Sequence, residues 1–151
     1  MTDFEKWKAK YYPVEASDKV SDLEALKEAL LKYEGVRPEV LAEYRLYRHW
    51  RDIYDMAHVK VVENKACLWT KFALNGATCS LCKKHMNMNM KYGTGDFWIE
   101  ACGKCPLNTL ETNCNLDKSP WRIMCDEGNV DPIIEKLKEL IEIEEEKIGN
   151  N

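Results

Sequence analysis

Residues 79–105 read CSLCKKHMNMNMKYGTGDFWIEACGKC and contain the same short motif twice. Cys79 and Cys82 form the first Cys-x2-Cys pair, Cys102 and Cys105 form the second, and nineteen residues separate the pairs. This spacing is typical of a site that holds Zn²⁺ with four thiolates. A two-residue gap lets one tight turn aim both sulfurs of a pair at the same ion. The pattern therefore predicts a structural zinc site made by these four cysteines.

The residues between the two pairs predict a β-hairpin. In residues 85–90 (HMNMNM) polar and apolar side chains alternate, which is the period of a strand. Residues 92–96 (YGTGD) are typical of a turn, and residues 97–101 (FWIEA) favour a return strand. Antiparallel pairing would bring the two cysteine pairs together, as in a zinc ribbon. Two strands alone are marginally stable in water, so bound metal would supply free energy that the hairpin lacks.

The chain has seven cysteines, and three lie outside the two pairs. Cys114 follows Cys105 by nine residues and is a reserve ligand that could replace one of the four. Otherwise it is a buried thiol, which is also the assignment favoured for Cys67 and Cys125, with a redox pair of those two as the alternative. The odd total argues against a disulfide scaffold, as does the absence of an apolar signal-peptide run in MTDFEKWKAK at the start.

Two other metal centres are alternatives to zinc. Cys105-Pro106 matches the Cys-Pro end of ferredoxin motifs, but the compact Cys-x2-Cys-x2-Cys run of those iron–sulfur proteins is absent. Met86, Met88 and Met90 could bind Cu(I) through their thioethers. Methionines on one strand face more often pack in a core or on a binding surface. Zinc therefore remains the favoured ion.

The sequence gives little support for catalysis. It contains no Gly-rich phosphate loop, no HExxH and no GxSxG motif. The three histidines, at positions 49, 58 and 85, are scattered. Four thiolates around Zn²⁺ leave no open coordination position for a substrate. We therefore expect a protein that is not an enzyme.

Helical periodicity predicts most of the remaining structure. Ser21 and Glu24 have the spacing of a capping box, and Gly35 ends the helix that they begin. Asp131 is the expected cap of the last helix, with Pro132 in its first position. In chain order we expect an extended arm with aromatic anchors over 1–20, helices over 21–34, 38–58 and 64–74, the β-hairpin, an irregular stretch over 106–130 tethered by Trp121, Ile123 and Met124, and a helix over 131–148.

These elements predict an α+β protein that is mostly helical. A helical hairpin and a C-terminal helix surround a zinc-ribbon-like β-hairpin. The parts are the N-terminal arm and helical hairpin (1–75), the zinc-binding hairpin and loop (76–130) and the acidic C-terminal helix (131–151). With 151 residues, 45% of them hydrophobic, the parts suit one compact unit.

The charge distribution restricts the partners. The net charge is −4, and residues 131–151 carry seven acidic but only three basic side chains. Such a chain is not built for bulk affinity to phosphate backbones, which depends on Lys and Arg contacts. Lys83, Lys84, Lys91 and Lys104 make the zinc region the most basic part, and they could face nucleic acid. The apolar stretches are too short to span a bilayer, so we expect no membrane contact and a cytoplasmic location.

Two segments carry a resemblance to a known group of proteins. The order CSLC (79–82), an intervening segment and CGKCPLNTLETNC (102–114) resembles small cysteine-rich bacteriophage proteins with a CxLC, a CxxCPL and one further cysteine. KYYPVEASDKVSDLEALKEALLKYEGVRPEVL (10–41) is similar to short phage reading frames with an aromatic-Tyr-Pro stretch before an LEAL-type helix. The resemblance implies a phage setting and no particular activity. That setting favours the binding of a host component over metabolism.

We therefore expect a zinc-binding accessory protein that binds and modulates a host protein. It would act as an adaptor or inhibitor of transcription, nuclease or defence machinery. The first alternative is a nucleic-acid-binding zinc-ribbon protein that uses the four lysines, and its binding would depend steeply on salt. The second is a redox or metal-handling protein, which requires an open coordination position or a thiol of low pKa.

Overall fold

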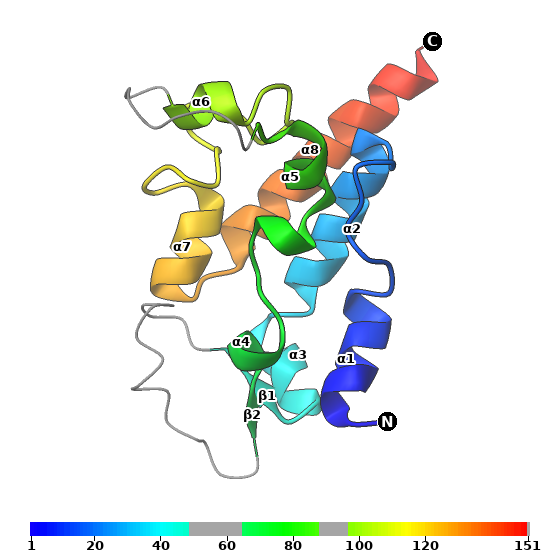
Figure 1. Ribbon diagram of the computed structural model, residues 1–151, viewed down its shortest axis with the longest axis vertical. Coiled ribbons are helices and arrows are strands. Elements are labelled where there is room, and N and C mark those ends of the chain that lie inside the picture. The colour runs from blue at the N-terminus through cyan, green and yellow to red at the C-terminus, as the bar shows by residue number, and fades with distance from the viewer. Residues whose placement is uncertain (49–64, 88–96, 151) are drawn as a thin grey trace.

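The computed structural model of the protein describes residues 1–48, 65–87 and 97–150 (Figure 1). Within these ranges it is mostly helical with one small parallel sheet, which is compatible with the expected α+β class. No described helix is long and apolar enough to cross a bilayer. In chain order the elements are α1 (Asp3–Tyr11), α2 (Asp22–Glu34), α3 (Pro38–Glu43), β1 (Leu46–Tyr47), β2 (Ala66–Cys67), α4 (Leu68–Lys71), the 3₁₀ turn η2 (Gly76–Thr78), α5 (Ser80–His85), α6 (Phe97–Ala101), α7 (Pro120–Glu127) and α8 (Asp131–Gly149).

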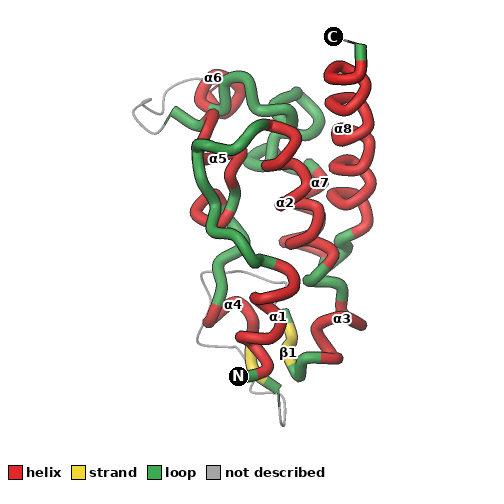
Figure 2. The backbone as a smooth tube through the Cα atoms, turned by 90° about the vertical axis from the view of Figure 1, so that its right-hand side faces the viewer, coloured by secondary structure: helices red, strands yellow, loops and turns green. Residues whose placement is uncertain are grey.

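The antiparallel helices α2 and α8 form the long axis of the fold (Figures 1 and 2). Arg37, just after α2, pairs with Asp131 at 2.7 Å, and Lys27 pairs with Glu145 at 3.4 Å. Both helices bury one face, because their apolar side chains recur at intervals of three and four residues. The buried apolar side chains are Ala25, Leu26, Ala29 and Tyr33 in α2 and Ile133, Ile134 and Leu137 in α8.

The predicted ends of these two helices are mostly confirmed. Ser21 caps α2 by accepting a hydrogen bond from the Glu24 amide at 3.1 Å, and Gly35 follows the last residue of that helix. The α8 helix ends at Gly149, one residue beyond the prediction. The cap predicted at Asp131 is wrong, because Val130 occupies the cap position and makes no capping hydrogen bond with its side chain. The Asp131 carboxylate pairs instead with a distant arginine, which local sequence does not indicate.

The extended arm predicted over residues 1–20 is wrong in its first half, which forms α1. A capping box starts this helix, since Thr2 Oγ1 accepts from the Glu5 amide at 3.1 Å and the Glu5 carboxylate accepts from the Thr2 amide at 2.9 Å. The aromatic anchoring is confirmed, because Trp7 is fully buried and donates to the Gly35 carbonyl at 2.8 Å. A Cβ at Gly35 would lie 2.5 Å from the Tyr11 ring, so α1 packs there against glycine.

The second long helix, predicted over 38–58, is also wrong because α3 ends at Glu43. Arg45 has φ of +53°, a left-handed conformation that a helix cannot contain. The chain then buries Leu46, which is 2% exposed, and β1 pairs in parallel with β2. The predicted helical hairpin is therefore reduced to α2 and the short α3. The remainder of the prediction, 49–58, lies outside the described residues.

Residues 64–74 contain less helix than predicted. The described part begins with the strand β2, and α4 is a single turn. Phe72 then continues in extended backbone, with its ring edge-on to Trp7 at 5.2 Å and to Tyr12 at 4.8 Å between centroids. This aromatic cluster fixes α4 to α1.

The zinc-ribbon hairpin requires the main correction. The return strand predicted over 97–101 is wrong, because these residues form α6. His85, the first residue of the other predicted strand, ends α5, and residues 88–96 lie outside the described residues. The two ends of the segment still meet, since the Asn87 amide donates to the Ala101 carbonyl at 2.6 Å. The ends of two short helices, rather than a pair of strands, therefore bring the cysteine pairs together.

Residues 106–130, predicted to be irregular, contain the helix α7, and Ser119 caps it with its side chain. The prediction holds for the first half of the stretch, which consists of turns. The predicted tethers are all at least partly buried: Trp121, Ile123 and Met124.

Candidate metal centre

The first cysteine pair lies at the start of α5, which polar side chains fix to α2. The Asp22 carboxylate accepts a hydrogen bond from Lys84 Nζ at 2.8 Å and lies 2.7 Å from His85 Nε2. The buried Ser80 hydroxyl donates to the Glu28 carboxylate at 3.0 Å. These contacts hold the cysteine-bearing turn against the side of α2.

The second cysteine pair lies in a loop that is shaped by its own Asn side chains. Asn108 donates to the carbonyls of Ile99 at 2.6 Å and Gly103 at 2.7 Å, and Asn113 donates to the Asn108 side-chain oxygen at 2.8 Å. Gly103 has φ of +54°, which favours glycine, and a Cβ there would lie 3.2 Å from the His85 carbonyl. The turn within the second pair therefore approaches the end of α5.

Four thiols from these two segments lie close enough together to change one another's pKa: Cys79, Cys82, Cys105 and Cys114. A hydrogen bond with Cys79 and burial raise the pKa of Cys82, and charges at Cys79, Cys114 and Cys105 raise it further. Burial raises the pKa of Cys105 to about 12 and also raises that of Cys114. The hydrogen bond from Cys82 lowers the pKa of Cys79. Like charges thus oppose the ionisation of Cys82, Cys105 and Cys114, and a bound cation would remove that opposition.

Cys102 lies beside this group. Its sulfur is 4.0 Å from Asn115 Nδ2, and its charge raises the pKa of both Cys105 and Cys114. Within residues 1–48, 65–87 and 97–150, no three Cys, His, Asp or Glu side chains are arranged to hold a metal ion. The thiols therefore gather in one region without forming a closed coordination shell.

A pocket of about 530 Å³ is lined by three of these four cysteines, Cys79, Cys82 and Cys114. A Cβ at Gly76 would lie 3.5 Å from the Cys82 sulfur, so the backbone of η2 forms one of its walls. Its other walls combine thiols with aromatic, apolar and polar side chains: Tyr33, Asn75, Ala77, Cys79, Cys82, Lys83, Met86, Cys114, Asn115 and Trp121. One side of the thiol group therefore faces open space.

Sequence analysis missed Lys32, which lies on α2 and is only 1% exposed. Its ammonium donates to the carbonyl of Thr78, the residue before Cys79, at 3.0 Å. Burial lowers the pKa of Lys32, whereas the charges of three thiols of the group raise it. Its position was a usable signal. Lys32 follows Ala25 and Ala29 at helical spacing on the buried face, where lysine is rare unless it is paired.

Cys67 and Cys125 do not line this pocket. Both are buried, as expected of structural thiols. Their charges raise the pKa of Arg48, although burial of that guanidinium lowers it overall. The two cysteines therefore lie in a separate basic environment, and their redox pairing stays a prediction.

The predicted basic patch is smaller than expected. Lys84 is partly buried and paired with Asp22, so it is not available to a phosphate in the way that the sequence suggested. Lys83 and Lys104 are exposed. Lys91 lies outside the described residues.

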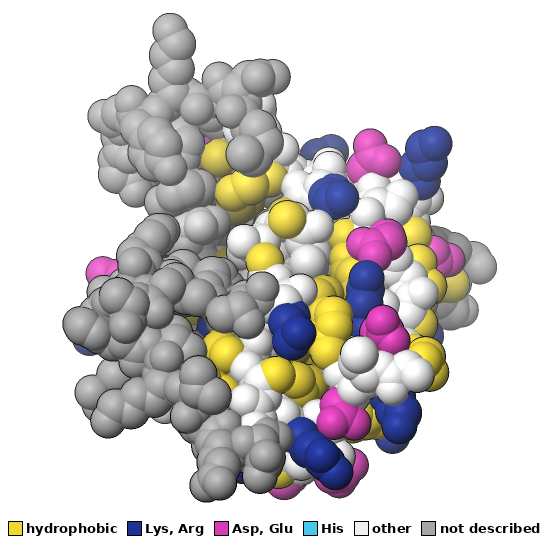
Figure 3. Space-filling model, turned by 60° about the horizontal axis from the view of Figure 1, so that its bottom comes forward, with side chains coloured by type: hydrophobic (Ala, Val, Ile, Leu, Met, Phe, Trp, Pro, Cys, Tyr) yellow, Lys and Arg dark blue, Asp and Glu magenta, His cyan; other side chains and the backbone are white. Residues whose placement is uncertain are grey.

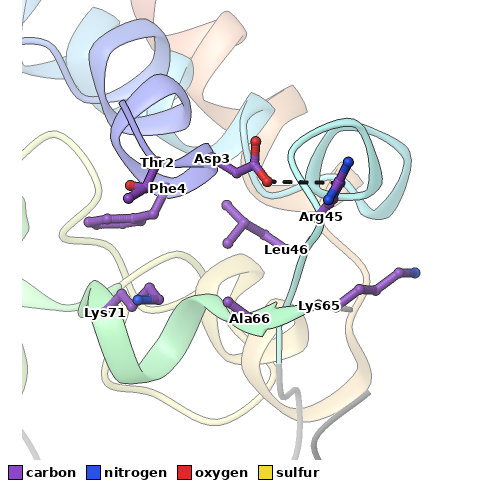
Figure 4. A pocket seen from close by; sticks show the side chains of 8 residues that line it. All are labelled: Thr2, Asp3, Phe4, Arg45, Leu46, Lys65, Ala66 and Lys71. Carbon is purple, nitrogen blue, oxygen red and sulfur yellow. Dashed lines mark ion pairs between the residues drawn. The ribbon is translucent and has the colours of Figure 1, made fainter. Parts of the chain in front are cut away.

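A second pocket, of about 450 Å³, lies between the start of α1 and the small sheet (Figure 4). Asp3 and Arg45 face each other at 3.9 Å, while Lys71 lies on the other side of the pocket. Its cations therefore do not converge on one point. Basic and acidic side chains are also mixed over the described part of the molecular face in Figure 3. This end of the molecule offers no concentrated positive surface among its described side chains.

Comparison with known proteins leaves the thiol group as the main guide to function. No protein-family model, curated protein or solved structure matches the chain.

Proposed function

We propose that the chain is a zinc-binding accessory protein, not an enzyme, that binds and modulates a host protein. The observation that carries the proposal is the gathering of thiols from two segments, 79–82 and 102–114, beside a buried lysine. None of the seven cysteines, all of which lie in the described ranges, is part of a disulfide. Several free thiols held together are typical of a metal centre in a reducing compartment, and the cytoplasm of a bacterial host is the proposed location.

The proposed ligands are Cys79, Cys82, Cys105 and Cys114. Cys114, the reserve ligand of the sequence prediction, takes precedence over Cys102 because it lines the same pocket as the first pair. Cys102 is the alternative fourth ligand. Zn²⁺ favours four thiolates in a tetrahedron at structural sites, and bound there it ties the second cysteine loop to α5.

Two features support a partner-binding role: the closed coordination of the proposed zinc ion and the exposed apolar side chains at the end of α8. A zinc ion with four thiolates has no free coordination position for a substrate. The end of α8 extends past α2 (Figure 2) and carries Ile143 and Ile148, which are 40% and 57% exposed. Four glutamates lie next to them in the sequence of α8: Glu142, Glu144, Glu145 and Glu146. Resemblance to cysteine-rich phage proteins points to a bacterial host protein as the partner.

A nucleic-acid role is the second candidate, carried by the exposed Lys83 and Lys104 on the two cysteine-bearing turns. Binding to single- or double-stranded nucleic acid that weakens steeply with salt supports this candidate. Binding that is absent at low salt removes it.

Metal analysis tests the proposed zinc centre. The full-length protein, purified without added metal, should contain one zinc per chain by mass spectrometry. Cys82→Ser, Cys105→Ser and Cys114→Ser should each lose it, because a hydroxyl is a poor replacement for a thiolate ligand. Cys67→Ser is the matched control and should keep its zinc. A parent protein without metal, or full zinc in all three ligand variants, contradicts the proposal.

Cys102→Ser decides between the two fourth ligands. Retention of zinc in Cys102→Ser with loss in Cys114→Ser identifies Cys114 as the ligand. The reverse pattern identifies Cys102.

Affinity capture tests the accessory role. The zinc-loaded parent and the Cys82→Ser variant are immobilised and exposed to a bacterial lysate, and captured proteins are identified by mass spectrometry. One host protein that binds the parent stoichiometrically and elutes with it in size-exclusion chromatography is expected. The absence of any such protein across hosts argues against the role.

A further inference from the structure

Lys32 occupies an unusual position for a lysine. It is among the largest fully buried side chains of the described residues, together with core residues such as Leu26 and Trp7. Its ammonium donates to the Thr78 carbonyl at 3.0 Å and lies 3.3 Å from the Thr78 hydroxyl. It also lies 4.9 Å from the centre of the Tyr33 ring. These neutral groups solvate the ammonium in part.

No carboxylate balances this charge at ion-pair distance within the described part of the chain. Glu28 is the acidic side chain whose charge acts on Lys32, but its carboxylate accepts a hydrogen bond from Ser80. A buried ammonium without a counter-charge is costly, and proteins normally pair it or neutralise it. The compensating negative charge must therefore come from somewhere else.

Among the described side chains, the thiols are the other source of negative charge that acts on Lys32. The charges that act most strongly on Lys32 are those of Cys79, Cys82 and Cys114, ahead of Glu28. The Thr78 carbonyl that binds the ammonium belongs to the residue that precedes Cys79. A zinc ion held by four thiolates carries an excess of two negative charges, which one adjacent ammonium reduces to one.

We propose that Lys32 is the built-in counter-ion of the thiolate centre and sets its affinity for the metal. This inference rests on the proposed zinc function. In the metal-loaded protein the ammonium offsets the excess negative charge of the centre. Without metal the centre carries less negative charge, so the same buried ammonium is compensated less well. Lys32 therefore stabilises the loaded protein and costs stability in the metal-free protein.

The test replaces Lys32 with neutral side chains in the full-length protein. Lys32→Met keeps the length and apolar stem, and Lys32→Gln also keeps a hydrogen-bond donor for Thr78. Zinc affinity is measured by competition with a chromophoric chelator. Both variants should bind zinc about tenfold or more weakly than the parent, the range seen when groups around a metal site are altered. Lys27→Met, an exposed lysine on the same helix, is the matched control and should bind like the parent.

Thermal unfolding of the metal-free proteins separates this role from simple packing. With chelator present, Lys32→Met should melt about 2–4 °C or more above the parent, because a buried charge has been removed. If Lys32 only stabilised the packing of the fold, metal-free Lys32→Met should instead melt below the parent. Unchanged zinc affinity in both variants, in a parent that binds zinc, overturns the counter-ion role alone. A parent that binds no zinc overturns the proposed function and this inference together.

Discussion

Asp22 fixes the position of the first cysteine pair through one carboxylate that serves two partners. Lys84 and His85 both contact it from the end of α5, at 2.8 Å and 2.7 Å. The three side chains are partly buried, so solvent screens their interaction less than that of an exposed pair. Each contact is a charge-assisted hydrogen bond when both partners are ionised.

Replacing Asp22 by Asn should lower the free energy of unfolding by about 1–2 kcal/mol, because hydrogen bonds to charged groups are lost or weakened. Urea denaturation of the metal-free parent and variant measures the difference. Asp18→Asn, which alters an exposed carboxylate, is the matched control and should change stability by less than about 0.5 kcal/mol. Equal stability of Asp22→Asn and the parent contradicts the structural role.

The same variant should alter the dependence of stability on pH. Partial burial raises the pKa of Asp22, but the contacts with Lys84 and His85 outweigh it and lower the pKa overall. A carboxyl with a lowered folded-state pKa contributes stability above its unfolded pKa of about 4, and that stability is lost as the pH falls through the folded pKa. Between about pH 4 and pH 2, Asp22→Asn should therefore lose stability less steeply than the parent.

At the scale of elements, α1 is a short helix that docks through its buried aromatic side chains, Trp7 and Tyr11. Trp7 is fully buried, bonds the Gly35 carbonyl at 2.8 Å and packs edge-on against Phe72. Helices of this length are marginal by themselves, so tertiary contacts supply most of their stability. The indole connects α1, the end of α2 and the segment after α4.

Trp7→Ala should therefore lower the free energy of unfolding by about 3–5 kcal/mol, the cost of emptying a large aromatic site. Chemical denaturation monitored by circular dichroism measures it. Lys6→Ala alters an exposed neighbour on the same helix and should have little effect. A loss below about 1 kcal/mol for Trp7→Ala would mean that α1 is not docked as described.

Sequence reasoning succeeded where a signal is local. Side-chain caps and glycine stops are local, and Ser21 and Gly35 mark the ends of α2 as predicted. The cysteine spacing also identified the region in which thiols gather. Asp131 failed as a cap because its partner, Arg37, lies far away in the chain.

The failures involve elements whose conformation depends on distant contacts. Residues 97–101 have side chains that favour a strand, but they form α6. A short apolar segment is compatible with either a helix or a strand, and β-propensity is a weak guide to which one forms. The helix predicted from Pro38 onward was based on apolar periodicity alone. That prediction ran through Arg45, where the backbone is left-handed and a helix cannot continue. Lys32 was missed for another reason: a lysine in an amphipathic pattern is normally assigned to the solvent face, although its spacing from Ala25 and Ala29 places it on the buried face.

The whole molecule combines two kinds of cohesion. The α2–α8 pair is held by apolar side chains that are almost completely buried, such as Leu26 and Leu137. The loop that carries Cys102, Cys105 and Cys114 depends more on hydrogen bonds from its Asn and Thr side chains. Such polar loops open locally at a smaller free-energy cost than an apolar core. The proposed zinc ion therefore stabilises the part of the fold that has the weakest cohesion of its own.

Removal of zinc from the full-length protein should accordingly open the cysteine loop before the helical core. Hydrogen exchange followed by mass spectrometry measures this directly. With chelator, amides of residues 102–115 should exchange about tenfold faster or more, while those of α2 and α8 change little, because local opening does not require global unfolding. The Cys82→Ser variant should show the same pattern without chelator and respond no further when chelator is added. If zinc is lost and exchange in 102–115 does not change, the metal does not stabilise this loop. If exchange becomes faster uniformly along the chain, zinc stabilises the whole fold and not the loop alone.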